Sequence, residues 1–395
     1  MRVLDVRCRT VTVTRFLDPG VAPCELTTAV VALATDAIRD GQQVVGYGFS
    51  SFGRVGGAAA DAGDLSRRLL QAHDEDLSDP EGSGLSPLRA REFVLRHRLP
   101  EALPPPAAVL GTLDMALWDA ASKIAGLPLF RFLGARLGQS PRSTVPVYAS
   151  GGYRYPRDDH ARLAEEVRRF LDAGHTHVKI KIGDCPLAED LERVETVLAL
   201  LPRPDRLAVD GMNRYAEGRV AAVAKALEPY GLRWIEDVCD PSDMESLSRL
   251  AAASVTPLGA GEAIRSLDDA RTVLRQGGLR PDRDVLLIDP VHCGGLPEYL
   301  AIVAAAEDLG WPRRAFFPHG GHLFSLHVAA ALGLGGCESN PASFQPFGGL
   351  AEGAGLRKGM AAPPEAPGIG FETKPTLVAL FESVRRGGPF PCPST

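Results

Sequence analysis

The amino-acid sequence predicts a parallel (β/α) barrel preceded by a smaller α+β domain. The chain has 395 residues, more than one ordinary hydrophobic core organises, so a large domain with a smaller companion is expected. From about residue 144, short apolar segments alternate with amphipathic helical stretches. Ionisable residues recur where these segments end, and the active sites of parallel barrels form at such strand ends. The same pattern therefore predicts the fold class and the position of the site.

Residues 1–140 predict the α+β domain. Val3–Val13 alternates as a strand does, Thr27–Asp36 is rich in β-forming residues, and GQQVVGYGF follows as a returning strand. A glycine-rich stretch, residues 50–63, predicts a loop. Three helical patterns come next, Leu65–Ala72, Pro87–His97 and Ala107–Ile124, and the last has a clear period of 3.6. Early strands followed by helices favour an α+β domain.

Residues 141–345 predict the barrel. Its eight apolar segments are Val145–Ser150, His177–Ile182, Arg206–Gly211, Arg233–Val238, Thr256–Glu262, Val285–Pro290, Arg314–His319 and Leu334–Ser339. The alternation of strands and helices implies parallel pairing through right-handed crossovers, as in a (β/α)8 barrel. A doubly wound sheet is the alternative, but no GxGxxG run opens a first helix. We expect the Gly- and Pro-rich segment 346–395 to return to the first domain.

Composition narrows the class of partner. The formal net charge of -6 argues against nucleic acid or an anionic membrane as the main partner. No stretch approaches the ~20 apolar residues of a membrane span. The seven cysteines are scattered without a CxxC pair, which is typical of a reducing compartment, and the N-terminus lacks the apolar run of a signal peptide. We therefore expect a cytoplasmic enzyme acting on a small molecule.

Three carboxylates occupy the ends of successive barrel segments. Asp210 ends the third segment, Glu236 lies near the end of the fourth, and Glu262 ends the fifth. Converging carboxylates without His or Cys form a hard oxygen site that suits Mg²⁺ better than Zn²⁺. The alternative is three separate surface acids, but solvated charges have no reason to recur at the same position of each unit. The sequence therefore predicts a magnesium site.

Two lysines lie near the end of the second segment. Lys179 and Lys181 are two residues apart, so a strand directs both into the barrel. A lysine pair of this kind is usually a solvated strand face, but the intervening residues here are apolar. Burial, mutual repulsion and a nearby metal should all lower their pKa values towards neutrality. One of them would then be a usable base.

Asp289 and His319 lie at the ends of the sixth and seventh segments, across the ring from the lysines. A carboxylate orients an imidazole and raises its pKa, which suits a general acid or a second base. The alternative for His319 is a core histidine in the PHGGH turn.

Further candidates for substrate contact lie in neighbouring loops and at the last strand end. His292 follows the sixth segment and could touch the substrate. Glu338 in the eighth segment would hydrogen-bond the reacting end of the substrate or cap a loop. Arg54, in the loop of residues 51–57, is expected to cover the site.

These motifs resemble a known family. KIK, VDG, IED and GE at successive strand ends, followed by an Asp and a His, resemble the mandelate racemase branch of the enolase superfamily. The resemblance covers essentially the whole chain. Longer segments, among them VVGYGF, GTLDMALWDA, YASGGYRYP, VKIKIG, PHGGH, GLGGCES and FQPFGG, are similar to those of D-tartrate dehydratases.

The resemblance implies a modified (β/α)7β barrel with an α+β capping domain, residues 1–140, completed by residues 346–395. It assigns roles to the following residues: Asp210, Glu236 and Glu262 as Mg²⁺ ligands, Lys181 as general base, Lys179 and Glu338 as supports of the substrate carboxylate, and His319 with Asp289 as general acid. It also implies a homo-oligomer.

The implied reaction is dehydration of a small 2,3-dihydroxy carboxylate, an acid sugar similar to tartrate. Lys181 would remove the α-proton, the metal would stabilise the enediolate, and His319 would protonate the departing β-hydroxyl to leave a 2-keto acid. Racemisation or epimerisation of a 2-hydroxy acid by the same Lys/His pair is the first alternative. A non-catalytic relative that binds a sugar acid is the second, and it draws on Met212 and Phe52, which stand where polar residues are expected.

Overall fold

The computed structural model describes residues 1–17, 21, 26–50, 58–80, 84–97, 106–351 and 355–387. Within these ranges the side chains of residues 58–63 and of Glu217 are not described. Arg54 and Phe52, both named from the sequence, lie outside the described residues.

The N-terminal part is built on an antiparallel sheet of three strands in the order β1-β2-β3. These are β1 (Val3–Val13), β2 (Leu26–Arg39) and β3 (Gln42–Phe49). An Asp-Gly turn joins β2 to β3, and both its residues have positive φ, 51° at Asp40 and 74° at Gly41. This dipeptide is preferred where a hairpin requires left-handed backbone at two consecutive positions.

Helix α4 (Ala107–Ala125) lies directly against β3 because β3 carries glycine on the facing side. A Cβ atom added at Gly46 would lie 2.1 Å from the carbonyl oxygen of Ala116, and one at Gly48 would lie 2.2 Å from that of Thr112. Any side chain there would therefore push the helix off the sheet.

Further helices surround this sheet: α1 (Ala58–Leu70), α2 (Asp74–Leu77), α3 (Pro87–Arg96), α5 (Leu129–Leu137) and α13 (Pro375–Arg386). Helix α1 begins inside the predicted loop of residues 50–63, a correction that the high helix propensity of its alanine run explains. Helix α13 packs on β1 and β2, and its Phe381 stacks on Tyr47 of β3 with 4.6 Å between ring centroids. The proposed completion of the first domain by the C-terminal segment requires this packing.

The larger part is a parallel barrel. Its strands pair in the order β10-β4-β5-β6-β7-β8-β9. They are β4 (Val145–Gly151), β5 (Val178–Lys181), β6 (Leu207–Asp210), β7 (Ile235–Glu236), β8 (Leu258–Ala260), β9 (Val285–Leu286) and β10 (Cys337–Ser339). The short strand β11 (Met360–Ala361) pairs antiparallel with β4.

The seventh predicted segment closes the ring without forming a strand. It makes one bridge, between Leu286 and Phe316, and the Phe317 amide donates to the Leu286 carbonyl at 2.9 Å. On its other side, the Glu338 amide donates to the Pro318 carbonyl at 3.4 Å. The prediction of a strand here is wrong, because Pro318 has no N–H to continue a ladder.

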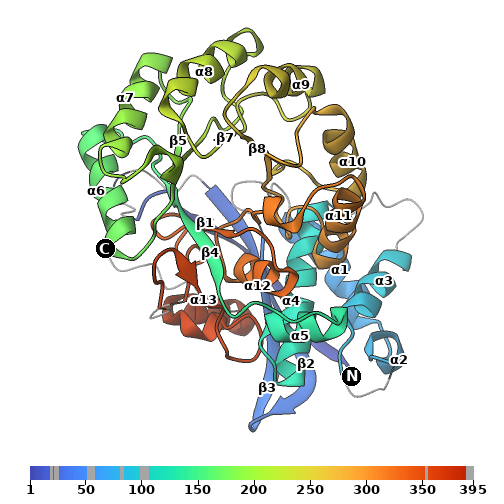
Figure 1. Ribbon diagram of the computed structural model, residues 1–395. Helices are drawn as coiled ribbons and strands as arrows, with labels where there is room; N and C mark the ends of the chain where they lie inside the picture. The colour runs from blue at the N-terminus through green and yellow to red at the C-terminus, as the bar shows by residue number, and fades with distance from the viewer. Residues whose placement is uncertain are drawn as a thin grey trace.

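The connecting helices pack around the strands, and all but the last of them form an arc outside the strands (Figure 1). They are α6 (Asp159–Asp172), α7 (Leu187–Leu198), α8 (Val220–Leu227), α9 (Met244–Ala253), α10 (Leu267–Gln276), α11 (Leu296–Asp308) and α12 (Leu323–Leu332). This is the α/β fold that the sequence predicts, a (β/α)7β barrel with an α+β cap. None of the helices in the described ranges has the length and apolar character needed to cross a lipid bilayer.

Side chains fill the barrel interior in layers. Tyr148, Ala208, Trp234, Leu287 and Phe317 form an apolar cluster separate from the main core, and we call it the aromatic layer. Ring centroids of Trp234 lie 5.2 Å from Tyr148 and 5.4 Å from Phe317. Side chains two residues apart share one face of a strand. On each strand, an inward-facing residue that precedes the aromatic layer therefore lies nearer the amino-terminal mouth of the barrel, and one that follows the layer lies nearer the carboxyl-terminal mouth.

Candidate active site

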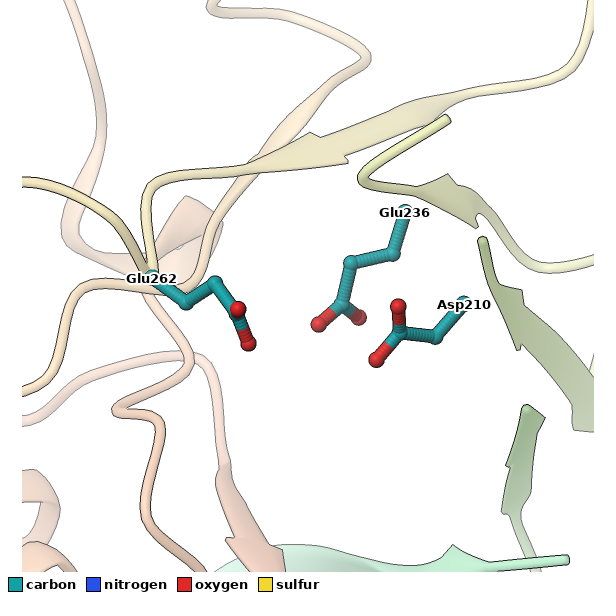
Figure 2. A group of neighbouring side chains, drawn as sticks. All are labelled: Asp210, Glu236 and Glu262. Atoms are coloured by element: carbon teal, nitrogen blue, oxygen red, sulfur yellow. The ribbon is translucent and has the colours of Figure 1, made fainter. Parts of the chain in front are cut away.

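Three carboxylates meet at the carboxyl-terminal mouth of the barrel. Asp210 ends β6, Glu236 ends β7, and Glu262 follows β8 by two residues. One oxygen from each lies within 4.8 Å of the others, and Figure 2 shows the three groups pointing into a common space. Asp210 and Glu236 are almost fully buried. The donor set contains only hard carboxylate oxygens, so it fits Mg²⁺.

Neighbouring N–H groups orient two of these carboxylates. The indole Nε1 of Trp234 donates to Glu236 Oε2 at 3.0 Å. The backbone N–H of Met212 donates to Asp210 Oδ1 at 2.8 Å. Met212 has a φ of 49°, a left-handed conformation that asparagine adopts more readily than methionine. Its contact with Asp210 nevertheless uses the backbone, so the methionine side chain does not remove it.

The two lysines lie against these carboxylates. Lys179 Nζ lies 2.6 Å from Glu236 Oε1 and 3.1 Å from Glu338 Oε1, and Lys181 Nζ lies 2.5 Å from Asp210 Oδ2. Burial lowers the pKa of both ammonium groups, but the adjacent carboxylates raise it by more than burial lowers it. Both pKa values therefore lie above the usual range for lysine. The prediction that the lysine pKa values shift towards neutrality is therefore wrong when only the charges of the protein act on them, because each lysine has an anionic partner.

His319 reaches the same cluster from the segment after β9. Its Nδ1 lies 3.3 Å from Asp289 Oδ2, and its Nε2 lies 3.2 Å from Glu262 Oε2. Burial lowers the pKa of His319, but the charge of Glu338 and the hydrogen bonds to Asp289 and Glu262 raise it to about 10. The imidazole is therefore protonated at neutral pH, and Asp289 determines its orientation.

Glu338 on β10 links the lysine side of the site to the histidine side. Its Oε1 pairs with Lys179, and its Oε2 accepts from the Gly320 amide at 3.0 Å and lies 3.8 Å from His319 Nε2. Burial raises the pKa of this carboxyl, but Lys179 and His319 lower it to about 2. Glu338 is therefore an anion held between two cations.

The remaining predicted residue in the described ranges, His292, lies just beside the site. Its backbone N–H donates to Asp289 Oδ1 at 3.0 Å, and its buried ring accepts from Arg265 Nε at 3.4 Å. Substrate contact by His292 stays a prediction.

The sequence interpretation overlooked three side chains at this mouth: Ser150, which hydrogen-bonds Glu338, Tyr153, whose ring centroid lies 5.6 Å from Lys181 Nζ, and Trp234. Period-two alternation along YAS would have identified Ser150 as facing inward, and the same alternation places Trp234 on the face of Glu236. Tyr153 lies beyond β4, where alternation no longer predicts direction.

Comparison with known families matches residues 162–377 to a family described as enolase C-terminal domain-like. The chain is 29% identical over 310 residues to an L-talarate/galactarate dehydratase of Salmonella typhimurium, covering 78% of this chain and 72% of that protein. It is 33% identical over 316 residues to a D-galactonate dehydratase family member of Catenulispora acidiphila, covering 70% and 69% respectively.

A solved structure shares the fold. The L-talarate dehydratase of Polaromonas sp. JS666, complexed with Mg and L-glucarate, superposes with a TM-score of 0.69 at 24% identity, covering 93% of this chain and 94% of that one.

Proposed function

The chain belongs to the enolase superfamily, in its mandelate racemase and muconate lactonizing enzyme branch, and from this premise we propose a magnesium-dependent acid-sugar dehydratase. Its substrate would be a small carboxylate with hydroxyl groups on C2 and C3. One observation carries the proposal: Lys181 and His319, two groups able to transfer protons, contact different members of one carboxylate cluster, at Asp210 and at Glu262.

Asp210, Glu236 and Glu262 would hold the ion. When bound, Mg²⁺ supplies positive charge that balances the substrate carboxylate and competes with Lys181 for Asp210. Lys179 would stabilise the remaining negative charge of that carboxylate by ion pairing, since its Nζ lies among Glu236, Glu338 and Asp210.

Proton removal falls to Lys181. Lys181 would first lose the proton that Asp210 stabilises, and its neutral amine would then take the proton from C2. The C–H electrons would pass into the carboxylate, and an enediolate would form. Tyr153 and Asp210 hold the Nζ in place at the mouth. The orientation is fixed by packing, so little entropy is lost as the reaction begins.

Loss of the hydroxyl falls to His319. Its Nε2 proton would pass to the hydroxyl on C3, the C–O bond would break as the enediolate collapses, and water would leave. The enol so formed would tautomerise to a 2-keto acid. Asp289 keeps the imidazolium oriented through Nδ1, which leaves Nε2 facing the substrate side of the ring.

Two observations narrow the class of acid that we propose as the substrate. The relatives described above are named for talarate, galactarate and galactonate, which favours a sugar acid. The D-tartrate-like motifs of the sequence keep four-carbon diacids among the candidates.

The proposal is tested by screening four- to six-carbon acid sugars with Mg²⁺ for 2-keto acid formation. We expect turnover of at least one acid, and a loss of ~10²–10⁴-fold in both Lys181→Met and His319→Asn. Lys225→Met, an exposed lysine on α8, is the matched control and should keep full activity.

Solvent deuterium separates the two roles. In D₂O, His319→Asn should still exchange the C2 proton without forming keto acid, whereas Lys181→Met should do neither. Full dehydration by Lys181→Met would refute the assignment of the base.

Racemisation or epimerisation remains the competing reaction, since the two groups reach the cluster from β5 and from the segment after β9. It predicts inversion at C2 with deuterium incorporation and no net loss of water. Binding of a sugar acid without turnover of any would instead favour a non-catalytic relative.

A further inference from the structure

The amino-terminal mouth of the barrel, at the opposite end from the carboxylates, contains a cavity of about 100 Å³. Basic side chains line it: His177, Arg206, Arg233 and Lys358. The proposed dehydration uses none of them, so the question is what this cavity binds.

Two of these residues lie just before the strands that carry the lysines and Asp210. His177 immediately precedes β5, Arg206 ends a short 3-10 turn (Pro204–Arg206) immediately before β6, and both line the cavity. The β5–β6 register sets Lys179 beside Ala208, which brings the preceding pair together as well. Arg206 Nη1 lies 2.9 Å from His177 Nε2.

Arg233 completes the inner wall. It precedes β7, and its guanidinium lies over the rings of Trp234, at 5.1 Å from the centroid, and Phe317, at 5.6 Å. Tyr148 and Phe317 of the aromatic layer line the cavity, so this layer lies between the cavity and the carboxylate site. A guanidinium stacked on aromatic rings keeps its N–H edge free for an acceptor.

Lys358 reaches the cavity from outside the barrel. It lies in the turn before β11 with a φ of 52°, a left-handed conformation uncommon for lysine. The following glycine anchors the turn: its N–H donates to the Gly174 carbonyl at 2.9 Å, and its carbonyl accepts from the Val147 amide at 2.8 Å. A Cβ at Gly359 would lie 2.3 Å from Thr176 Oγ1, so a larger residue at this position would clash with the start of the barrel wall.

Arg206, Arg233 and Lys358 have no carboxylate partner within ion-pair distance among the residues that the structure describes. The carboxylate that acts on Arg233 is Asp205, which is more than half exposed and pairs with Arg203 at 2.7 Å. Elsewhere in the described residues, partly buried arginines such as Arg283 and Arg313 pair with an acid. Lys358 is exposed, but Arg206 and Arg233 are partly buried, and clustered cations in such positions are costly without an anion.

We propose that this mouth binds a small oxyanion of the size and charge of phosphate. A cavity of about 100 Å³ has room for a small tetrahedral anion. Guanidinium groups donate paired hydrogen bonds to such oxygens. The ion would join the starts of β5, β6 and β7 and the turn before β11, and it is independent of the proposed reaction.

Isothermal titration with inorganic phosphate tests the site, with magnesium chelated and ionic strength held constant with chloride. We expect one saturable site, and at least tenfold weaker binding in Arg206→Gln and in Lys358→Met. Arg203→Gln, an exposed neighbour outside the lining, is the control and should bind as the wild type does. Thermal unfolding on the same proteins should show a phosphate-dependent rise in Tm that Arg206→Gln lacks.

Absence of saturable binding, or equal binding by all three variants, would overturn the proposal. Phosphate could also bind beside the catalytic lysines, and in that case Lys179→Met would abolish binding while Arg206→Gln would not, which also overturns it. A phosphomonoester arm identifies the source: binding of glycerol 3-phosphate as tight as that of phosphate supports the phosphate group of a larger molecule, and weaker binding supports the free ion.

Discussion

Two histidines at opposite mouths of the same barrel have pKa values displaced in opposite directions. At the carboxyl-terminal mouth, burial lowers the pKa of His319, but Glu338, Asp289 and Glu262 raise it to about 10. At the amino-terminal mouth, burial lowers the pKa of His177, and Arg233 and Arg206 lower it further, to about 3. The same kind of side chain is thus a cation at one mouth and neutral at the other.

The difference shows that partners, and not burial alone, determine charge inside this barrel. Lys179 and Lys181 are both buried, yet each keeps its proton beside a carboxylate. Arg206 and Arg233 face no carboxylate within ion-pair distance among the described residues. The aromatic layer keeps the two environments apart, so acids at one mouth do not compensate cations at the other.

Removing one cation from each mouth should have opposite effects on stability. Lys179→Met leaves Glu236 and Glu338 without their cation and should lower the free energy of unfolding by ~3–5 kcal/mol, as breaking a buried ion pair does. Arg206→Gln relieves like-charge repulsion and should leave it unchanged or raise it. Urea unfolding in magnesium-free and phosphate-free buffer measures both.

Added Mg²⁺ should restore part of the stability lost in Lys179→Met, since a metal supplies the missing positive charge. A loss in Arg206→Gln as large as that in Lys179→Met would contradict the contrast between the mouths.

A smaller effect is expected where the aromatic layer supports the carboxylates. Trp234→Phe keeps a ring in the layer but removes the N–H that orients Glu236 at 3.0 Å. Loss of such a supporting hydrogen bond should weaken Mg²⁺ affinity by ~10–100-fold, measured by calorimetry. Trp118→Phe, a buried tryptophan in α4 away from the barrel, is the matched control and should bind Mg²⁺ normally. Unchanged affinity in Trp234→Phe would show that Glu236 needs no such support.

The smallest effect concerns His177 and pH. Its pKa in the folded protein lies below its unfolded value of ~6.5, so the unfolded chain binds the proton first as pH falls. Its contribution to stability is therefore complete above pH ~6.5 and is lost as pH decreases towards 3. Because the ring is partly exposed, we expect about 1 kcal/mol, read as the difference between wild type and His177→Gln at pH 7 and pH 5.

Phosphate should raise the pKa of His177, followed by NMR titration of the ring, because an anion beside Arg206 opposes the repulsion. A His177 that titrates near 6.5 without phosphate would contradict the assigned environment.

Much of the fold could be predicted because its regularities are local. Alternating apolar segments and helices indicated the barrel, and glycine at Gly46 and Gly48 is compatible with a strand under a closely packed helix. Predictions were wrong where a local rule met a tertiary constraint. The segment ending at His319 contains Pro318 and makes one bridge in place of a strand, and α1 extends into a stretch that its glycines marked as a loop.

The sequence predicted which residues form the candidate site better than it predicted the pKa shifts of those residues. The spacing of Asp210, Glu236 and Glu262 indicated convergence, which the structure shows within 4.8 Å. The pKa direction of Lys181 was not predictable from Lys179 alone, because Asp210, 29 residues away in sequence, is its partner at 2.5 Å.

The sequence by itself determined which side chains face the barrel axis and at which level. A strand alternates with a period of two, so the order His177, Lys179, Lys181 places one basic group towards one mouth and two towards the other. Only the tertiary structure decided which of these charges have partners. Ring closure brings Glu338 of β10 to Lys179 of β5, whereas no carboxylate among the described residues comes within ion-pair distance of Arg206. The reason is physical: charge interactions depend on distance through space and on burial, and closure of the barrel determines both.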